Sequence, residues 1–177
     1  MLRGERIVLR AIEREDLANY VEWFSDPAVL AYFGPFAPMS LAEEQQWYER
    51  SLQDSSVLNF AVVLEGRHVG GCGFSNIDHR NARAEIGLLI GLPELWDQGL
   101  GFDVLCTLLR FGFEQMNLHR IYLRVFAENE RAVHLYEKIG FCHEGRWREA
   151  AFRHGRYHDL LWLGILRDEW APPGSDV

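Results

Sequence analysis

The chain has 177 residues, of which 48% are hydrophobic and 25% charged, a composition ordinary for a globular protein. This length is enough for one domain with a sizeable hydrophobic core. The formal net charge of −8 argues against the phosphate backbone of a nucleic acid as a partner.

Hydrophobic patterns predict the regular elements in chain order. Alternating or continuous apolar runs predict strands at 6–11, 57–64, 67–77, 83–91, 120–127, 142–152 and 156–166. Apolar residues at helical spacing predict helices near 14–24, 40–53, 101–117 and 129–139. The tripeptide EGR around Gly66 and the stretch RHGRY at 153–157 each predict a hairpin turn.

This order predicts an α/β chain with a mixed, mostly antiparallel sheet of seven strands, flanked by four helices. The strand–helix–strand unit at 83–127 is expected to pair its strands in parallel through a right-handed crossover. We expect residues 1–170 to form one domain. The tail at 171–177 contains two prolines and a glycine, and we expect it to be disordered.

The cysteines do not form a metal-binding pattern. Cys72, Cys106 and Cys142 show no C-x-x-C or Cys/His spacing, so neither a disulfide framework nor a zinc site is expected. The N-terminus lacks the apolar stretch of a signal peptide, and no run approaches the ~20 apolar residues of a membrane span. We therefore expect a cytoplasmic protein with no metal and no membrane partner.

A glycine-containing loop precedes the third predicted helix. The strand RAEIGLLIG leads into LPELWDQGLG, and the helix then begins near Gly101. The N-terminus of a helix offers free N–H groups to an anion, and Gly99 and Gly101 let a phosphate approach the backbone closely. The dinucleotide pattern G-x-G-x-x-G is broken by Val104, and no Walker loop is present. A helix start with a glycine needed only for packing stays open.

A second motif narrows the interpretation. NERAVHLYEKIGF, from Asn129 to Phe141, directly follows the strand IYLRVFAE. Together with the glycine loop about 30 residues earlier, it resembles the GNAT acetyltransferase superfamily. The opening GERIVLRAIEREDL and the closing HGRYHDLLWLGIL resemble the branch of ribosomal-protein N-terminal and spermidine/diamine acetyltransferases. The resemblance covers roughly residues 4 to 168.

The resemblance implies acetyl-CoA as the cofactor, with its pyrophosphate in the glycine loop and its pantetheine arm between two splayed central parallel strands. Trp96 occupies a slot that this branch commonly fills with tryptophan. Asp97 departs from a frequent glycine, and its carboxylate is unfavourable beside a diphosphate unless it points to solvent. The cofactor-binding residues implied are Leu88, Leu89, Ile90, Trp96, Asp97, Gln98, Gly99, Leu100, Gly101, Phe102, Asn129, Ala132 and Lys138.

The family's reaction is direct attack of an amine on the thioester, without an acyl-enzyme. Tyr136 matches the tyrosine that protonates the sulfur of coenzyme A, and it lies two helical turns beyond Asn129, about 10 Å along the axis. Glu85 matches a glutamate that deprotonates the amine through water. Two alternatives stay open: Tyr136 as a core residue of an apolar helix face, and Glu85 as an ion-pair partner of Arg83 or Arg80.

The part of the site that binds the acceptor amine is expected to lie between the first two predicted helices. The segment from Gly34 to Ser40 contains no carboxylate, which argues against a polyamine. Phe33, Phe36 and Trp147 are predicted to bind the acceptor, with Trp23 and Trp47 as further candidates for an aromatic wall; the alternative is that these aromatics belong to the core. This composition favours a peptide N-terminus or a small amine with an apolar part.

The basicity of the acceptor amine is a second criterion for choosing between acceptor classes. A lysine-like amine is only ~0.04% neutral at pH 7, a cost of about 4.6 kcal/mol, whereas an α-amine is near ~10% neutral at a cost of about 1.4 kcal/mol. A weak general base therefore favours α-amines.

The sequence therefore predicts an acetyl-CoA-dependent N-acetyltransferase acting on a peptide or small-molecule primary amine. The alternatives are a polyamine (spermidine) acetyltransferase, a non-catalytic acyl-CoA-binding module and a nucleotide-binding oxidoreductase. A homodimer is compatible with an exposed strand near the C-terminus.

Overall fold

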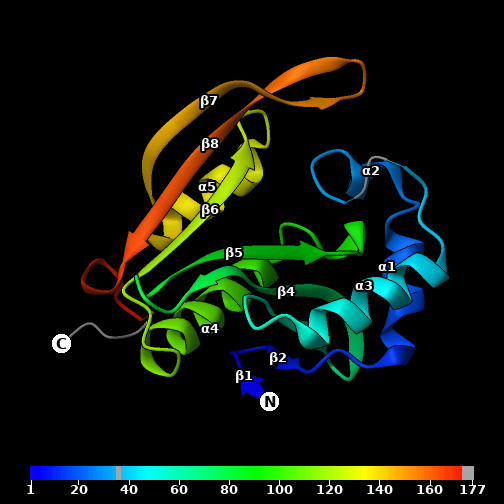
Figure 1. Ribbon diagram of the computed structural model, residues 1–177, viewed down its shortest axis with the longest axis horizontal. Coiled ribbons are helices and arrows are strands. Elements are labelled where there is room, and N and C mark those ends of the chain that lie inside the picture. The colour runs from blue at the N-terminus through cyan, green and yellow to red at the C-terminus, as the bar shows by residue number, and fades with distance from the viewer. Residues whose placement is uncertain (35–36, 173–177) are drawn as a thin grey trace.

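The computed structural model describes residues 1–34 and 37–172, which form a sheet with helices on both faces (Figure 1). Within these residues the sheet has eight strands: β1 (Leu2–Arg3), β2 (Ile7–Arg10), β3 (Leu58–Leu64), β4 (Arg67–Asp78), β5 (Arg83–Ile90), β6 (Arg120–Phe126), β7 (Cys142–Arg153) and β8 (Arg156–Leu166). The α-helices are α1 (Leu17–Trp23), α2 (Pro27–Leu30), α3 (Leu41–Gln53), α4 (Leu100–Glu114) and α5 (Glu130–Ile139). Short 3-10 helices lie at Arg14–Asp16, Pro93–Leu95 and Arg167–Glu169.

The strand order is β1-β2-β3-β4-β5-β6-β8-β7, and every neighbouring pair is antiparallel except β5 and β6. Helix α4 connects these two parallel strands, as the strand–helix–strand unit predicted. The predicted mixed, mostly antiparallel sheet is therefore confirmed, as are both hairpins.

The parallel pair separates after three residues. Arg83, Ala84 and Glu85 of β5 pair with Arg120, Ile121 and Tyr122 of β6, and the pairing then ends. Beyond this point β5 continues to pair only with β4, and β6 only with β8. Figure 1 shows the two strands diverging toward their C-terminal ends. The backbone groups along the facing edges are thus not used in sheet pairing between β5 and β6.

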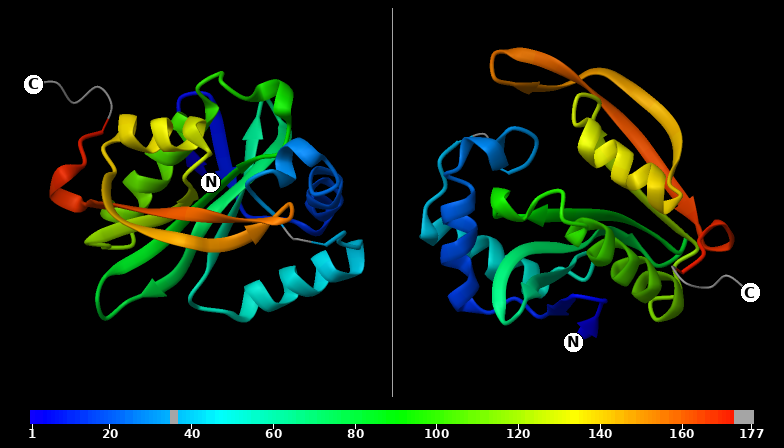
Figure 2. Two further views of the ribbon diagram at one scale, coloured as in Figure 1. Left: turned by 90° about the horizontal axis from the view of Figure 1, so that it is seen from above. Right: turned by 180° about the vertical axis from the view of Figure 1, so that it is seen from behind.

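Two apolar clusters lie on opposite faces of the sheet. Helices α4 and α5 cover one face, where Leu105 and Leu108 are fully buried among strand residues such as Ile121. Helix α1 and part of α3 cover the other face around Ala61 and Leu89 (Figure 2). Successive strand residues point to opposite faces, so neighbouring residues of one strand serve different clusters.

Three short features differ from the sequence prediction. Strand β1 pairs with β2, but two residues are too few to show a strand pattern. Helix α2 has four residues, begun by Asp26, whose carboxylate accepts the N–H of Ala28. The helix predicted at 14–24 is divided at Asp16, which bonds the Arg10 side chain and the N–H of Glu13. The sheet therefore has one more strand, and the fold one more α-helix, than predicted.

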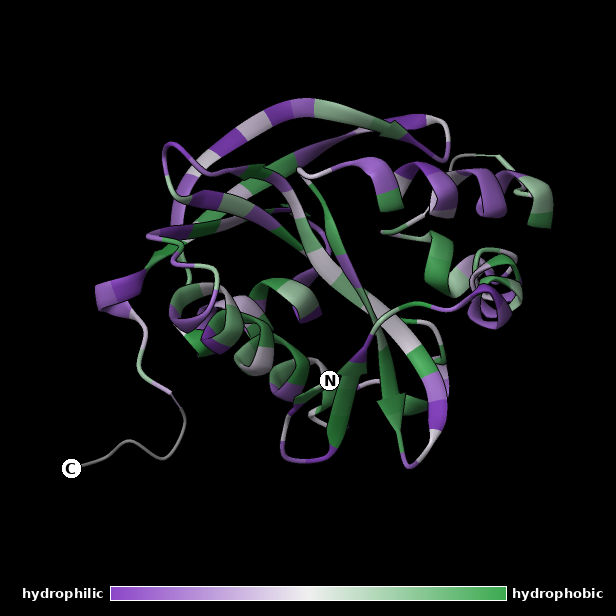
Figure 3. Ribbon diagram, turned by 60° about the horizontal axis from the view of Figure 1, so that its bottom comes forward, coloured by the Kyte–Doolittle hydropathy of each residue, from purple (hydrophilic) through white to green (hydrophobic). Residues whose placement is uncertain are grey.

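Hydropathy follows this layering. In Figure 3 the central strands are coloured mainly hydrophobic, whereas the long outer strand β7 is largely hydrophilic. Most residues of β7 are exposed. None of the helices in the described part of the chain is long and apolar enough to cross a membrane. The end of the predicted tail, 173–177, lies outside the described residues.

Candidate active site

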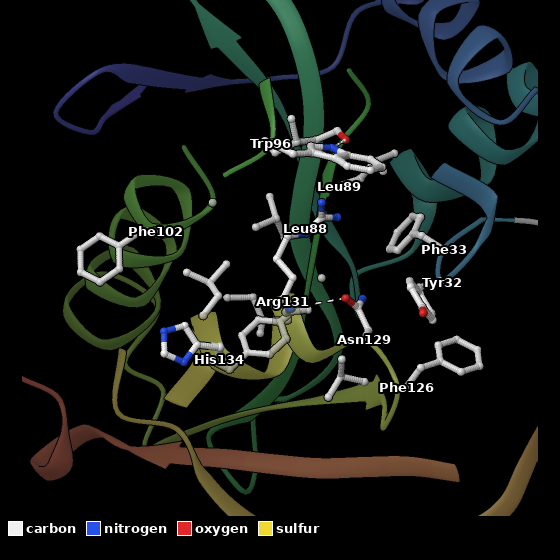
Figure 4. A pocket seen from close by; sticks show the side chains of 18 of the residues that line it. Tyr32, Phe33, Leu88, Leu89, Trp96, Phe102, Phe126, Asn129, Arg131 and His134 are labelled. Atoms are coloured by element: carbon white, nitrogen blue, oxygen red, sulfur yellow. Dashed lines mark hydrogen bonds between the residues drawn. The ribbon is translucent and has the colours of Figure 1, made fainter. Parts of the chain in front are cut away.

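A cleft opens where β5 and β6 diverge (Figure 4). Its floor is formed by Glu85 to Ile90 of β5 and by Arg124 to Phe126 of β6. The glycine loop closes one end, α5 forms a side wall along its length, and the segment around α2 closes the other end. The predicted pantetheine residues Leu88, Leu89 and Ile90 all line this cleft.

The glycine loop presents an open helix N-terminus to the cleft. Gly99 is the N-cap of α4 with φ of 80°, a left-handed conformation that glycine adopts without strain. No side chain caps the helix there, and nothing lies within 4 Å of the place where a Cβ of Gly99 would stand. At Gly101 a Cβ would come within 2.9 Å of Leu135, so glycine lets α4 lie close to α5. The first N–H groups of α4 therefore remain available for an anion.

The N-terminal turn supports this loop from behind. The carboxylate of Asp103, in the first turn of α4, accepts the backbone N–H groups of Glu5 (2.8 Å), Arg6 (2.7 Å) and Ile7 (3.1 Å). The Arg6 guanidinium donates to the carbonyl of Gln98 at 2.7 Å. The end of the glycine loop and the start of α4 are thus both held by residues 5–7.

An arginine that the sequence analysis did not select lies over the loop. The guanidinium of Arg131 stands 4.0 Å from the centroid of the Trp96 ring and 3.9 Å from the Asp97 carboxylate. The Trp96 indole N–H donates to the carbonyl of Ile90 at 2.8 Å, which ties the loop to the end of β5. Asp97 is largely exposed and faces a cation, so its charge is partly offset near the proposed phosphate position. In the sequence, Arg131 could have been selected as the arginine of the NERA motif.

The predicted residues of α5 lie along one wall of the cleft. Asn129 is the N-cap of α5, and its side-chain oxygen accepts the N–H of Ala132 at 3.3 Å. Lys138 lies with its ammonium group 5.1 Å from the centroid of the Phe102 ring. His134 also lines the cleft (Figure 4). The motif therefore supplies both the start of the helix and its cleft-facing side.

Tyr136 lines the same wall two turns farther along α5. Its ring packs edge-on against Phe141, with centroids 5.8 Å apart. Burial raises the pKa of Tyr136 to about 12. The phenol therefore keeps its proton at neutral pH, as a proton donor must. Tyr136 packs against the core and also lines the cleft, so the two readings of this residue are compatible.

Glu85 lies at the point where the strands separate and is only 8% exposed. Its carboxylate accepts hydrogen bonds from Arg124 Nε (2.7 Å), Arg124 Nη2 (3.1 Å) and Asn76 Nδ2 (2.8 Å). The expected alternative partner Arg83 pairs with Asp78 instead. Glu85 therefore forms an ion pair, but with neither of the expected arginines: its partner is Arg124 of β6, two residues beyond the last parallel pair.

Aromatic rings surround the end of the cleft opposite the glycine loop. Phe33 lines it as predicted, 41% exposed and stacked on Phe24 with centroids 6.3 Å apart. Tyr32 and Phe126, which the sequence analysis did not select, lie 5.9 Å apart, centroid to centroid, in the same wall (Figure 4). The predicted residue Phe36 lies outside the described residues.

Trp147 does not line the cleft, so this prediction is wrong. Its ring lies 4.7 Å from that of Trp162, in a shallow surface depression with Arg148 and Glu149. The register of β7 against β8 shifts between Trp147 and Ala151, and such irregularities redirect side chains. Trp23 and Trp47 pack in the cluster around α1, as the alternative core reading expected.

These features fit acetyl-CoA. The open start of α4, with space at Gly99 and cations at Arg131 and Lys138, suits phosphate groups. The unpaired edge of β5 beyond Glu85 suits the amide groups of a pantetheine arm. Among the described residues no cluster of histidine, cysteine, aspartate or glutamate could hold a metal ion.

Comparisons with known proteins agree with this geometry. The model of the acetyltransferase (GNAT) domain family matches residues 6–142. A spermidine N(1)-acetyltransferase of Escherichia coli (strain K12) is 30% identical over 170 residues, covering 96% of this chain and 91% of that protein. The crystal structure of spermidine N-acetyltransferase from Vibrio cholerae in complex with CoA and spermine has a TM-score of 0.86 at 31% identity, covering 94% of this chain and 98% of that one. A dodecameric structure of the Vibrio cholerae enzyme has a TM-score of 0.81 at 31% identity, covering 93% and 96%.

The family match extends over most of the chain, and the relatives are aligned over nearly their whole length. The resemblance seen in the two sequence motifs is thereby confirmed, and the oxidoreductase alternative is set aside. The chain belongs to the GNAT acetyltransferase family and is an acetyl-CoA-dependent N-acetyltransferase.

Proposed function

We propose that the acceptor is an α-amine next to an apolar or aromatic group, presented by a peptide N-terminus or by a small molecule. The observation that carries this proposal is the aromatic wall formed by Tyr32, Phe33 and Phe126 at the acceptor end of the cleft. Such rings gain free energy by covering apolar surface of a ligand, which an extended polycation offers only in its methylene segments.

The charges in the cleft support the same choice. Among the described lining residues the carboxylates are Glu85 and Asp97, and each faces an arginine. A polyamine would have to compete with Arg124 for Glu85, and the nearby guanidinium would repel it. The spermidine acetyltransferases among the relatives favour polyamines as the second candidate.

Tyr136 is proposed as the general acid. Bound acetyl-CoA would supply the acetyl group as a thioester. Tyr136 would then hold a proton at its phenol oxygen for the departing sulfur, which its raised pKa of about 12 keeps in place at neutral pH.

Glu85 as a general base stays a prediction. Its two oxygens already accept three hydrogen bonds, so taking up a proton competes with Arg124. A base of this kind serves an α-amine, which is partly neutral at pH 7, better than a lysine-like amine.

The residues predicted to bind acetyl-CoA remain a proposal. Phosphate contacts are assigned to the amides of 98–102, with Arg131 added beside Trp96, and the pantetheine arm to the edge of β5 at 88–90. We further propose a cytoplasmic location, one domain ending near residue 170, and a homodimer or larger assembly. The dodecameric Vibrio cholerae relative and the unpaired outer edge of β7 support the assembly.

A competition experiment tests the acceptor class. A mixture of peptides beginning with Phe, Met, Ala or Ser, together with spermidine and an aminoglycoside, would be incubated with the protein and acetyl-CoA, and the products identified by mass spectrometry. Acetylation of a peptide α-amine in preference to spermidine is expected. Acetylation of spermidine alone would contradict the proposal, and the alternative would take its place.

A further inference from the structure

The wall that faces the acceptor includes a short segment with little internal support. We call residues 27–34 the α2 cover; it contains one turn of helix and carries Tyr32 and Phe33 to the cleft. Val29 anchors it in the cluster around α1, where it is 3% exposed. Beyond Leu30 the cover has no regular structure, so its position must be fixed from outside.

That support comes from the far end of the chain. The guanidinium of Arg153, the last residue of β7, donates to the carbonyl oxygens of Leu30 (2.5 Å), Gly34 (2.8 Å) and Phe33 (3.1 Å). The β7–β8 hairpin extends across to α2 in both Figure 1 and Figure 2. An arginine presents its N–H groups in a rigid planar fork, so three carbonyl contacts fix the cover in one orientation.

The backbone of Arg153 is held in turn by a buried histidine. His158 is 5% exposed, with Nε2 3.1 Å from the carbonyl oxygen of Arg153 and Nδ1 3.1 Å from a carboxylate oxygen of Glu128. The imidazole thus links the backbone of Arg153 to the side chain of Glu128. The Phe126 ring packs edge-on against the imidazole, and Arg156 acts electrostatically on Glu128 from the same hairpin.

The same residue, Glu128, also meets the α2 cover. The Tyr32 hydroxyl donates to the backbone carbonyl of Glu128 at 3.4 Å, a long and weak contact. Glu128 directly precedes Asn129, the N-cap of α5, the helix that carries Tyr136. The cover, the hairpin and the start of the catalytic helix therefore meet in one network.

We propose that Arg153 is a positioning residue that fixes the α2 cover and thereby sets the affinity for the acceptor, with His158 and Glu128 as its support. This inference rests on the proposed function only in placing the acceptor beside the cover. Arg153 contacts backbone carbonyls of the cover and the Phe126 ring. It is therefore expected to govern acceptor KM and to leave the affinity for acetyl-CoA unchanged.

The test compares Arg153→Gln and Arg153→Lys with the matched control Arg148→Gln. Arg148 is an exposed arginine of the same strand; among the described residues it acts electrostatically on Asp159 but has no hydrogen bond or ion pair. Steady-state kinetics with the acceptor found by the competition experiment should show acceptor KM raised at least tenfold in Arg153→Gln. Arg153→Lys, which keeps the charge but loses the fork, should lie between. The Kd for acetyl-CoA and kcat should change less than threefold, and Arg148→Gln should match the wild type.

Hydrogen exchange gives a readout that needs no acceptor. In Arg153→Gln the backbone amides of the α2 cover should exchange at least tenfold faster, while those of α4 and α5 keep their wild-type rates. Unchanged exchange in the cover, or an acceptor KM that stays at the wild-type value, would overturn the proposal. If no amine is acetylated, the proposed function fails, and the exchange rates alone decide the role of Arg153.

Discussion

Tyr136 combines a partly buried ring with an available hydroxyl. Its ring packs on Phe141, and its burial raises the pKa to about 12. Within the described residues no hydrogen-bond partner of the hydroxyl is found. Removing this oxygen therefore costs the fold little, which makes the residue suitable for separating catalysis from stability.

Tyr136→Phe is expected to lower kcat by roughly 10²–10⁴, the range of a general acid. The melting temperature and the Kd for acetyl-CoA should stay close to the wild type. Single-turnover kinetics with saturating acetyl-CoA would measure the effect on the chemical step. A loss below threefold would remove Tyr136 from the proposed mechanism.

The role of Glu85 as a general base can be tested by its replacement with glutamine. If its carboxylate assists deprotonation of the acceptor, Glu85→Gln should lower the rate on an α-amine at pH 7 by about 10²-fold, the lower edge of general-base effects. The deficit should shrink toward pH 9, where the free amine is predominantly neutral. The same deficit at both pH values would instead mean that Glu85 acts by holding Arg124 in place, and the base assignment would be withdrawn.

At the scale of an element, the start of α4 depends on one backbone conformation. Gly99→Val places a β-branched residue at φ of 80° and a side chain in the open space of the loop. The Kd for acetyl-CoA, measured by calorimetry, should rise at least tenfold. Gly66→Val is the matched control, because Gly66 has φ of 82°, equally open surroundings and a place in the β3–β4 turn. Equal Kd values for the two variants would contradict the phosphate-loop assignment.

Helix α3 carries a buried acid that makes its packing depend on pH. Glu44 is 3% exposed, and burial raises its pKa to about 7. An unfolded glutamate ionises near pH ~4.3, so between these values the unfolded chain binds fewer protons than the folded one. The contribution of Glu44 to stability is therefore fully present below the unfolded pKa, falls as pH rises toward 7, and levels off above it.

Glu44→Gln should accordingly stabilise the protein at pH 8 by roughly 1–3 kcal/mol, which corresponds to about 2–4 °C in Tm per kcal/mol at this size. At pH 4 the difference between variant and wild type should nearly vanish. Thermal unfolding of both proteins at the two pH values provides the measurement. An equal difference at pH 4 and pH 8 would show that the ionisation of Glu44 is not its source.

At the scale of the whole molecule, regular periodicity made the main elements predictable. The strands of the central sheet and helices α4 and α5 repeat their apolar residues over enough turns to be recognised. β1 and α2 were missed because two and four residues are too few to show a period. The two motifs located the glycine loop and Tyr136 because each motif lies within one continuous stretch of chain.

The residues of the site that escaped prediction depend on contacts between distant segments. Arg124 meets Glu85 across the splayed strands, 39 residues away, and Arg153 reaches Gly34 across 119 residues. No local pattern encodes such a pairing. Trp147 failed for a related reason, since the irregular register of β7 changes which face its residues occupy.

This fold presents an aromatic acceptor end without a free carboxylate among its described lining residues. The most direct test is the ratio of kcat/KM for a peptide with an N-terminal Phe to kcat/KM for spermidine, both at pH 7.5 with saturating acetyl-CoA. We expect a ratio of at least ten in favour of the peptide. A ratio below one would contradict it and would assign the cleft to polyamines.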